Sequence, residues 1–130
     1  MREPSIELDR LANNVIGAAI EVHRDLGPGF LESVYEKALC KELELRDIPY
    51  SSQQTFSIEY KDSEVGAGRI DLLIGNELIV EIKAVSELAP IHSAQIMSYL
   101  KANNKLLGLL INFNVPLLKN GIKRIIFSQD

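Results

Sequence analysis

The chain has 130 residues, of which 46% are hydrophobic and 25% are charged. This composition is typical of one ordinary globular domain and excludes a disordered, collagen-like or coiled-coil chain. The formal net charge of −4 excludes a uniformly basic surface that binds phosphate backbones through charge alone. We expect a single domain over residues 1–130, without a membrane span or a signal peptide. The single cysteine, Cys40, cannot form an internal disulfide, which fits a cytoplasmic location.

Two helices are predicted at the start of the chain. Apolar residues recur every three or four positions over residues 5–25, which predicts an amphipathic helix with Ser5 as its N-cap. A Gly-Pro-Gly sequence at residues 27–29 ends this helix. The same spacing predicts a second helix over residues 31–46, where an Asp-Ile-Pro sequence follows.

The rest of the chain alternates between strand-like and helical segments. Five short runs with period-two alternation or continuous apolar character predict strands, and one helical segment with Pro in its first turn lies between the third and fourth. The strands are expected over residues 55–60, 69–74, 78–83, 106–113 and 122–127, and the helix over 90–103. This order predicts an α/β fold.

The turn between the second and third strands decides which side chains meet. A two-residue turn pairs Asp71 with Val80 and mixes charged with apolar residues on both faces. A three-residue turn over residues 75–77, or a bulge of the same parity, pairs Asp71 with Glu81 and gives one continuous apolar face. That face contains Ile70, Leu72, Ile74, Leu78, Val80, Ile82 and Ala84. We therefore predict the second register, which gathers Asp71, Glu81 and Lys83 on the other face.

These three side chains form a candidate metal site. Two neighbouring carboxylates repel each other unless a proton or a cation lies between them. Oxygen ligands suit Mg²⁺ or Mn²⁺, and Lys83 is placed to hold or deprotonate a water beside such an ion. The alternative is an exposed sheet face whose Glu-Lys pairs contribute a fraction of a kcal/mol each, on the order of 0.5.

Two helices carry further polar residues at helical spacing. Glu32 and Tyr35 are three residues apart on the second helix, and Gln95 and Tyr99 are four apart on the third. A tyrosine at this spacing is commonly a core residue, and a glutamate in a first helical turn is commonly a solvated carboxylate stabilised by the helix dipole. These residues therefore support a site only in combination with the hairpin.

The ordered set of Glu32, Asp71, Glu81, Lys83, Gln95 and Tyr99 resembles the PD-(D/E)XK nuclease superfamily. The sequence Gly-Phe-Leu-Glu-Ser-Val-Tyr at residues 29–35 is similar to the signature of its small GxxExxY proteins, and so is Gly-Leu-Leu-Ile-Asn-Phe at residues 108–113. The resemblance covers about residues 11–126. Ile70 stands where the superfamily name has a proline, a position that tolerates change.

The resemblance implies a restriction-endonuclease-like αβββαβ core with a mixed central sheet flanked by helices. It implies Asp71, Glu81 and the Ile82 carbonyl as metal ligands, with Glu32 contacting the ion directly or through water. Lys83 would orient the attacking water, and Gln95 and Tyr99 would position a phosphate or Lys83. Tyr35 belongs to the same motif as a supporting residue. The implied reaction is hydrolysis of a phosphodiester to a 5′-phosphate and a 3′-hydroxyl, with Mg²⁺ or Mn²⁺ as cofactor.

Three functions remain open at this point. The first is a nuclease, with DNA as the expected substrate and a homodimer as a possible assembly. The second is a non-catalytic module that binds nucleic acid or protein, and the third is a metal-dependent hydrolase of a small phosphorylated compound. The last 39 residues carry five basic side chains and one acidic one, whereas the first 91 carry 9 basic and 17 acidic ones. The candidate phosphate contacts are therefore Lys101, Lys105, Lys119, Lys123 and Arg124.

Overall fold

The computed structural model describes residues 3–128. In chain order it contains two helices, three strands, a third helix and two further strands, the last preceded by a short 3₁₀ helix, η1. The helices are α1 (Ile6–Leu26), α2 (Glu32–Leu45) and α3 (Pro90–Ala102), the strands are β1 (Tyr50–Tyr60), β2 (Ser63–Ile74), β3 (Leu78–Lys83), β4 (Leu107–Asn112) and β5 (Ile122–Ile126), and η1 is Leu118–Gly121. No helix in the described part of the chain is long and apolar enough to cross a membrane.

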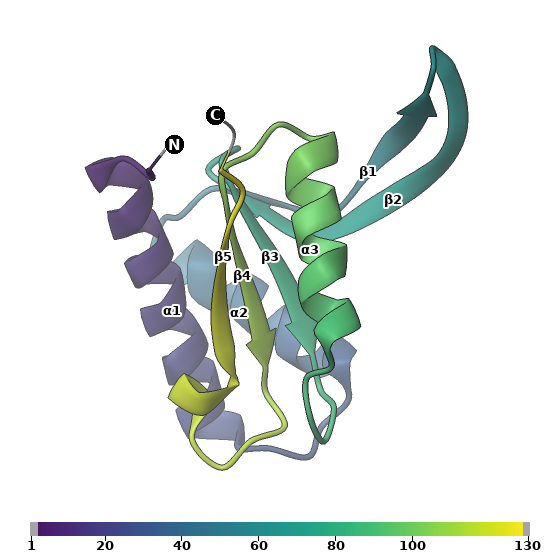
Figure 1. Cartoon of the computed structure of the whole chain (residues 1–130). Coiled ribbons are helices and arrows are strands. Elements are labelled where there is room, and N and C mark those ends of the chain that lie inside the picture. Colours follow the sequence, from purple (N-terminus) through teal and green to yellow (C-terminus); the bar gives the residue numbers. More distant parts are fainter. Residues whose placement is uncertain (1–2, 129–130) are drawn as a thin grey trace.

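The five strands form one mixed sheet in the order β1-β2-β3-β4-β5. β3 and β4 are parallel because α3 connects them, and the other neighbours are antiparallel. Figure 1 shows α3 on one side of the sheet and α2 on the other. The predicted α/β architecture is confirmed, and it has the restriction-endonuclease-like layout of a mixed sheet between helices.

Two apolar clusters hold the layers together. The larger one joins α1 and α2 to one face of the sheet, with Leu72, Val80 and Leu109 among its buried members. The smaller one joins α3 to the other face through Ile79, Ile96 and neighbours. β4 is buried at every position, as its apolar sequence predicts. The central strands are therefore covered on both faces.

The helix starts follow local chemistry. Ser5 is the N-cap of α1 as predicted, and its Oγ accepts the N–H of Leu8 at 3.1 Å. α2, by contrast, begins after Leu31 without a side-chain cap. A side chain therefore caps the N-terminus of α1 but not that of α2.

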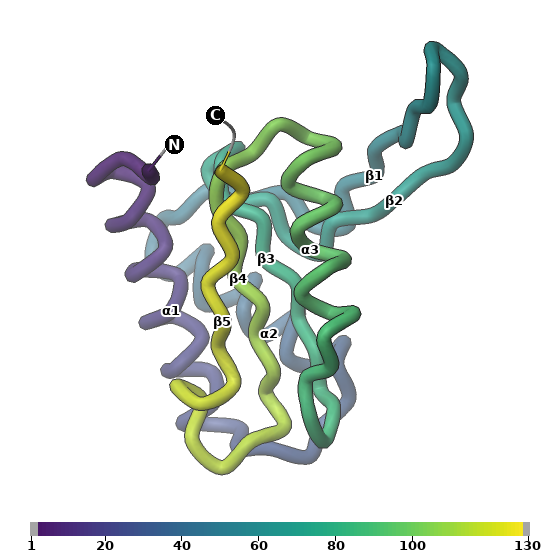
Figure 2. Tube along the Cα trace, in the orientation of Figure 1, coloured from purple at the N-terminus to yellow at the C-terminus, as the bar shows by residue number. Residues whose placement is uncertain are grey.

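β1 and β2 are longer than the sequence predicts and form an arm that leaves the body of the molecule (Figures 1 and 2). β1 starts at Tyr50 instead of residue 55, and β2 starts at Ser63 instead of residue 69. Most side chains of the arm are exposed on both faces. Residues 50–54 and 63–68, which the sequence did not predict as strands, therefore lack the period-two alternation that reveals a half-buried strand.

The turn between β2 and β3 has the predicted three-residue register, with Ile74 opposite Leu78 and Leu72 opposite Val80. The prediction that Ile70 shares the face of Leu72 is wrong. Ile70 packs in the smaller cluster with α3. β2 pairs with β3 only from Leu72 to Ile74, and the residues before Leu72, including Ile70, belong to the part of β2 that diverges into the arm.

Candidate metal centre

The candidate centre lies where β2 and β3 separate. Beyond the last pair, the main-chain N–H of Asp71 donates to Oε2 of Glu81 at 2.8 Å, and the N–H of Ile82 donates to Oδ2 of Asp71 at 2.8 Å. Each carboxylate therefore replaces a main-chain acceptor that the diverging strand no longer supplies. The two carboxylates are held beside each other, as the predicted register requires.

The main chain of Ile82 contributes to the same opening. Its N–H points toward β2, because it donates to Asp71. The carbonyl of the next residue, Lys83, points the other way and accepts the N–H of Phe113 at 2.9 Å. Since the N–H and the carbonyl of one strand residue face the same edge, the Ile82 carbonyl also faces the gap between β2 and β3.

Glu81 is only 4% exposed. Burial, followed by the negative charge of Asp71, raises the pKa of Glu81 to about 8, while the N–H bond from Asp71 and the charge of Lys83 act in the opposite direction. A buried carboxyl beside a second carboxyl is stable when it holds a proton or faces a cation. This pair is thus a site that a cation would stabilise.

Lys83 and Glu32 complete the charged group. Lys83 lies two residues beyond Glu81 on β3, so the two side chains share a face. Glu32 is the first residue of α2 and is exposed, yet partial burial of its carboxyl raises its pKa, against the effect of Lys83 and together with the charge of Asp71. The structure therefore brings all four predicted charged residues into electrostatic range of one another.

The donor set is small. Within residues 3–128, no three His, Cys, Asp or Glu side chains converge closely enough to hold one ion. The carboxylates of Asp71 and Glu81 lie beside each other, and the Ile82 carbonyl faces the same side of β3. All are hard oxygens suited to Mg²⁺ or Mn²⁺, which retain several waters. Glu32 stands outside this set.

A comparison with known families matches most of the chain. A family model described as the PD-(D/E)XK nuclease superfamily matches residues 9–125. The chain belongs to the PD-(D/E)XK nuclease superfamily. No curated protein matches the sequence.

In this member of the superfamily, Tyr35 holds the loop that leads to Glu32. Tyr35 is fully buried and stacks on Phe113, with ring centroids 4.6 Å apart. Its hydroxyl donates to the Gly27 carbonyl at 2.5 Å and accepts the N–H of Phe30 at 3.1 Å. The Tyr35 side chain therefore lies in the core and fixes the main chain before α2, instead of entering the carboxylate pair.

Gln95 and Tyr99 lie on α3, which covers the face of the sheet that carries Ile79. Glu81, two residues after Ile79 on β3, lies on the same face. Nε2 of Gln95 donates to the Tyr99 hydroxyl at 3.4 Å. The Tyr99 ring contacts Phe56 edge-on, with centroids 5.0 Å apart. Gln95 and Tyr99 therefore contact each other, and the Tyr99 ring also packs against Phe56 of β1.

The five predicted phosphate contacts do not form one group. Lys105 donates to the carbonyl of Asn76 at 2.8 Å, at the end of β3 opposite to Lys83. Arg124 pairs with Asp9 of α1. The others are distributed over the last turn of α3, η1 and β5, namely Lys101, Lys119 and Lys123. Their shared positive charge in the sequence does not produce one basic surface beside Asp71 and Glu81.

Two residues that sequence reasoning missed support the centre. Asn112, 2% exposed, accepts the Val85 N–H at 3.0 Å and donates to the Val85 carbonyl at 2.9 Å, which braces the chain just after Lys83. His92, on the first turn of α3, accepts the Ala89 N–H through Nδ1 at 3.0 Å and lies within electrostatic range of Glu32. Asn112 could have been found from the sequence as a polar residue at the end of an apolar strand. No sequence pattern distinguishes His92.

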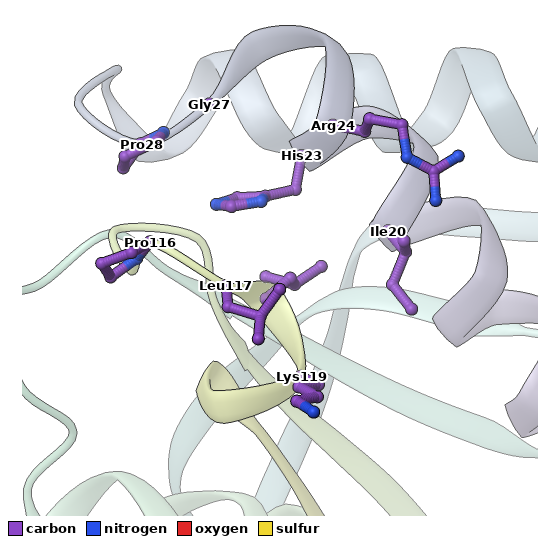
Figure 3. Close-up of a pocket in the computed structure, with 9 residues that line it drawn as sticks. Ile20, His23, Arg24, Gly27, Pro28, Pro116, Leu117 and Lys119 are labelled. Atoms are coloured by element: carbon purple, nitrogen blue, oxygen red, sulfur yellow. The ribbon is translucent and has the colours of Figure 1, made fainter.

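A cavity elsewhere on the molecule is mostly apolar (Figure 3). It lies between the end of α1 and the connection from β4 to η1, with His23, Pro116 and Leu117 in its lining. A ring nitrogen of His23 is hydrogen-bonded to the Val115 carbonyl at 2.8 Å. His23 therefore serves the fold, and the cavity is separate from the carboxylate pair.

Proposed function

We propose that this chain is a metal-dependent nuclease of the GxxExxY type that hydrolyses phosphodiester bonds in DNA. The observation that carries the proposal is the reciprocal hydrogen bonding of Asp71 and Glu81 across the point where β2 leaves β3. Two hard carboxylates fixed at an opening, with a lysine beside them, are suited to a divalent cation and a phosphate.

In this proposal, Asp71, Glu81 and the Ile82 carbonyl hold Mg²⁺ or Mn²⁺. When bound, the cation supplies Lewis acidity that polarises a phosphoryl oxygen and lowers the pKa of a water. The protein fixes both ligands in advance, because Oδ2 of Asp71 and Oε2 of Glu81 are each held by a main-chain N–H. Loss of the Glu81 proton accompanies cation binding, since its pKa is raised to about 8 without one.

Lys83 performs the remaining chemistry at the proposed site. Its ammonium group shares a face with Glu81, so it can hold the attacking water through Nζ and stabilise negative charge on the phosphoryl oxygens. Glu32 approaches from α2 and acts through water. Gln95 and Tyr99, on the helix that covers this face, orient the phosphate or Lys83.

Cleavage of DNA by the purified protein tests this function. Plasmid and oligonucleotides are incubated with Mg²⁺, Mn²⁺ or EDTA, and wild type is compared with Asp71→Ala and Lys83→Ala. Asp62→Ala, in the turn of the exposed arm, is the matched control for Asp71→Ala. We expect cleavage with either metal by wild type and the control only. Cleavage that survives in Asp71→Ala would show that another site, or a contaminant, is responsible.

A metal titration separates the nuclease from a non-catalytic binding module. The melting temperature of wild type should rise with Mn²⁺, because a ligand that binds only the folded state stabilises it. Asp71→Ala should lose the rise and Asp62→Ala should retain it. No rise in wild type, together with no cleavage, would favour a binding module on the same fold.

A further inference from the structure

Exposed apolar side chains flank Glu32 and His92 in the sequence, and these two residues lie within electrostatic range of each other. Leu31 is 76% exposed and Phe30 is 49% exposed in the loop, and Val34 is exposed on the first turn of α2. Ile91, 68% exposed, occupies the first turn of α3. We call Phe30, Leu31, Val34 and Ile91 the apolar rim.

The loop that displays the rim is built to be rigid. Gly27 and Gly29 have φ angles of 70° and 112°, in the region that favours glycine, with Pro28 between them. The Tyr35 hydroxyl bonds to the main chain at both Gly27 and Phe30. A mobile loop can expose apolar residues by default, but a braced loop holds them in a defined place.

The position of Leu31 also runs against local stability. It is the N-cap of α2, where Ser, Thr, Asp or Asn would satisfy a free N–H and where an apolar residue costs about 1 kcal/mol. A local rule broken in an otherwise consistent fold marks a position under functional demand. The exposed Leu31 side chain is accessible to a molecule outside the chain.

The rim adjoins the residues of the proposed function. Leu31 immediately precedes Glu32, whose carboxyl lies within electrostatic range of Asp71, Lys83 and His92. Ile91 immediately precedes His92. A phosphodiester placed at the carboxylate pair would therefore bring its neighbouring nucleotides against the rim.

The chemistry of the rim distinguishes between forms of DNA. A blunt duplex presents its phosphates outward and keeps its base faces stacked inside, so it offers the apolar rim no apolar surface to contact. An unpaired strand exposes base faces, which bind apolar and aromatic side chains. We propose that the apolar rim binds the bases of an unpaired DNA strand next to the cleaved phosphodiester. The substrate class is thus single-stranded DNA or the single-stranded end of a duplex.

This inference rests on the proposed nuclease function, and a binding assay tests it independently of cleavage. Fluorescence anisotropy with Lys83→Ala protein and Mn²⁺ compares a labelled single strand with a blunt duplex of the same sequence. We expect the single strand to bind at least about 10-fold tighter than the blunt duplex at the same salt concentration. A duplex with a single-stranded overhang should bind like the single strand.

Matched substitutions in the same protein locate the contact. Leu31→Ala and Ile91→Ala should each weaken single-strand binding several-fold, and Phe30→Ala about 10-fold because a stacked base is worth about 1–3 kcal/mol. Leu45→Ala, at the other end of α2 and 65% exposed, is the control for Leu31→Ala. Ile6→Ala, 67% exposed on α1, is the control for Ile91→Ala and should have no effect.

Four results would overturn the inference. The first is a blunt duplex that binds as tightly as the single strand, and the second is equal weakening of binding by Leu31→Ala and Leu45→Ala. Concentration-dependent dimerisation that Leu31→Ala abolishes would assign the rim to contact with a second copy. Rim-dependent binding of the single strand without cleavage by wild type would refute the proposed nuclease activity but not the binding role of the rim. Duplex cleavage that rim substitutions leave unchanged would refute the binding role of the rim but not the nuclease activity.

Discussion

The two halves of β3 show how one strand serves both the core and the candidate centre. From Leu78 to Val80 the strand pairs with β2 and β4, and its side chains are fully buried. From Glu81 to Lys83 it pairs with β4 alone, and polar side chains replace the missing contacts to β2. The change occurs within one residue.

The divergence of β2 from β3 brings the carboxylates of Asp71 and Glu81 together. While both neighbours are present, main-chain groups satisfy each other and leave no room for a ligand. Once β2 turns into the arm, the N–H of Ile82 needs a side-chain acceptor, which Asp71 supplies. We therefore expect substitutions in the first half of β3 to change stability and those of the charged residues in the second half to change metal binding and chemistry.

Leu78→Ala and Lys83→Ala should separate these two effects most strongly. Loss of the buried Leu78 side chain should lower the free energy of unfolding by about 4 kcal/mol, because a cavity remains in the core. Lys83→Ala should change it by less than about 1 kcal/mol and reduce cleavage at least about 100-fold. Chemical denaturation and a cleavage assay at the same temperature measure both. Equal stability losses in the two variants would contradict the division of the strand.

Asn112 should stabilise the second half of β3 from the side of β4. Asn112→Ala leaves both the N–H and the carbonyl of Val85 without partners in a partly buried position, which should cost about 2 kcal/mol. Hydrogen exchange of the Val85 amide should also accelerate. Asn103→Ala, which loses one bond to the Tyr99 carbonyl at the far end of α3, is the control. A similar loss in both variants would indicate that Asn112 has no special role near Lys83.

Glu81→Gln should stabilise the metal-free protein and abolish its response to Mn²⁺. The pKa of Glu81 is raised to about 8 in the folded state, so folding binds a proton. The wild-type protein is then most stable below the unfolded pKa near 4.5 and loses stability as the pH rises to about 8. Glutamine keeps an oxygen that accepts the Asp71 N–H and carries no charge. The expected gain is about 2 kcal/mol at pH 8 and close to zero at pH 4.

Thermal melts of both proteins across this pH range, with and without Mn²⁺, check the prediction. Glu59→Gln, on the exposed arm, is the control and should respond to Mn²⁺ as wild type does. A gain in stability that is the same at pH 4 and pH 8 would show that the Glu81 charge is not its cause.

The fold was predictable from sequence wherever burial imposes a period. The three helices and β4 follow from apolar spacing, and the parity of the hairpin placed Asp71 beside Glu81 before any geometry was known. The arm was not predictable in full, because residues such as Ser52 and Gln54 are exposed on both faces and carry no alternation. The predicted face of Ile70 was wrong because the alternation of side chains along a strand was assumed to continue through a regular pair of strands. β2 pairs with β3 only from Leu72 to Ile74, so Ile70 lies outside that pair.

The supporting residues of the centre depend on main-chain contacts that no sequence pattern encodes. Asn112 acts on Val85, 27 residues away, and its partner is backbone of any sequence. The five basic residues near the C-terminus are close together in the sequence, but they lie on four different segments: α3, the loop after it, η1 and β5. Proximity in sequence predicts proximity in space only within one element.

Tyr35→Phe tests the smallest effect, the connection between the core and the apolar loop before Glu32. The ring should keep its stacking on Phe113, while the Phe30 N–H and the Gly27 carbonyl lose their shared partner. The expected loss of stability is about 1 kcal/mol, because the loop is near solvent and water can replace the hydroxyl in part. Tyr50→Phe, whose exposed hydroxyl donates to Glu44, is the control and should cost less. If Tyr35 braces the loop, its variant should also weaken single-strand binding several-fold with an unchanged Mn²⁺ response, since the carboxylate pair lies on another element. An intact binding affinity in Tyr35→Phe would mean that the glycines and Pro28 fix the loop without the hydroxyl.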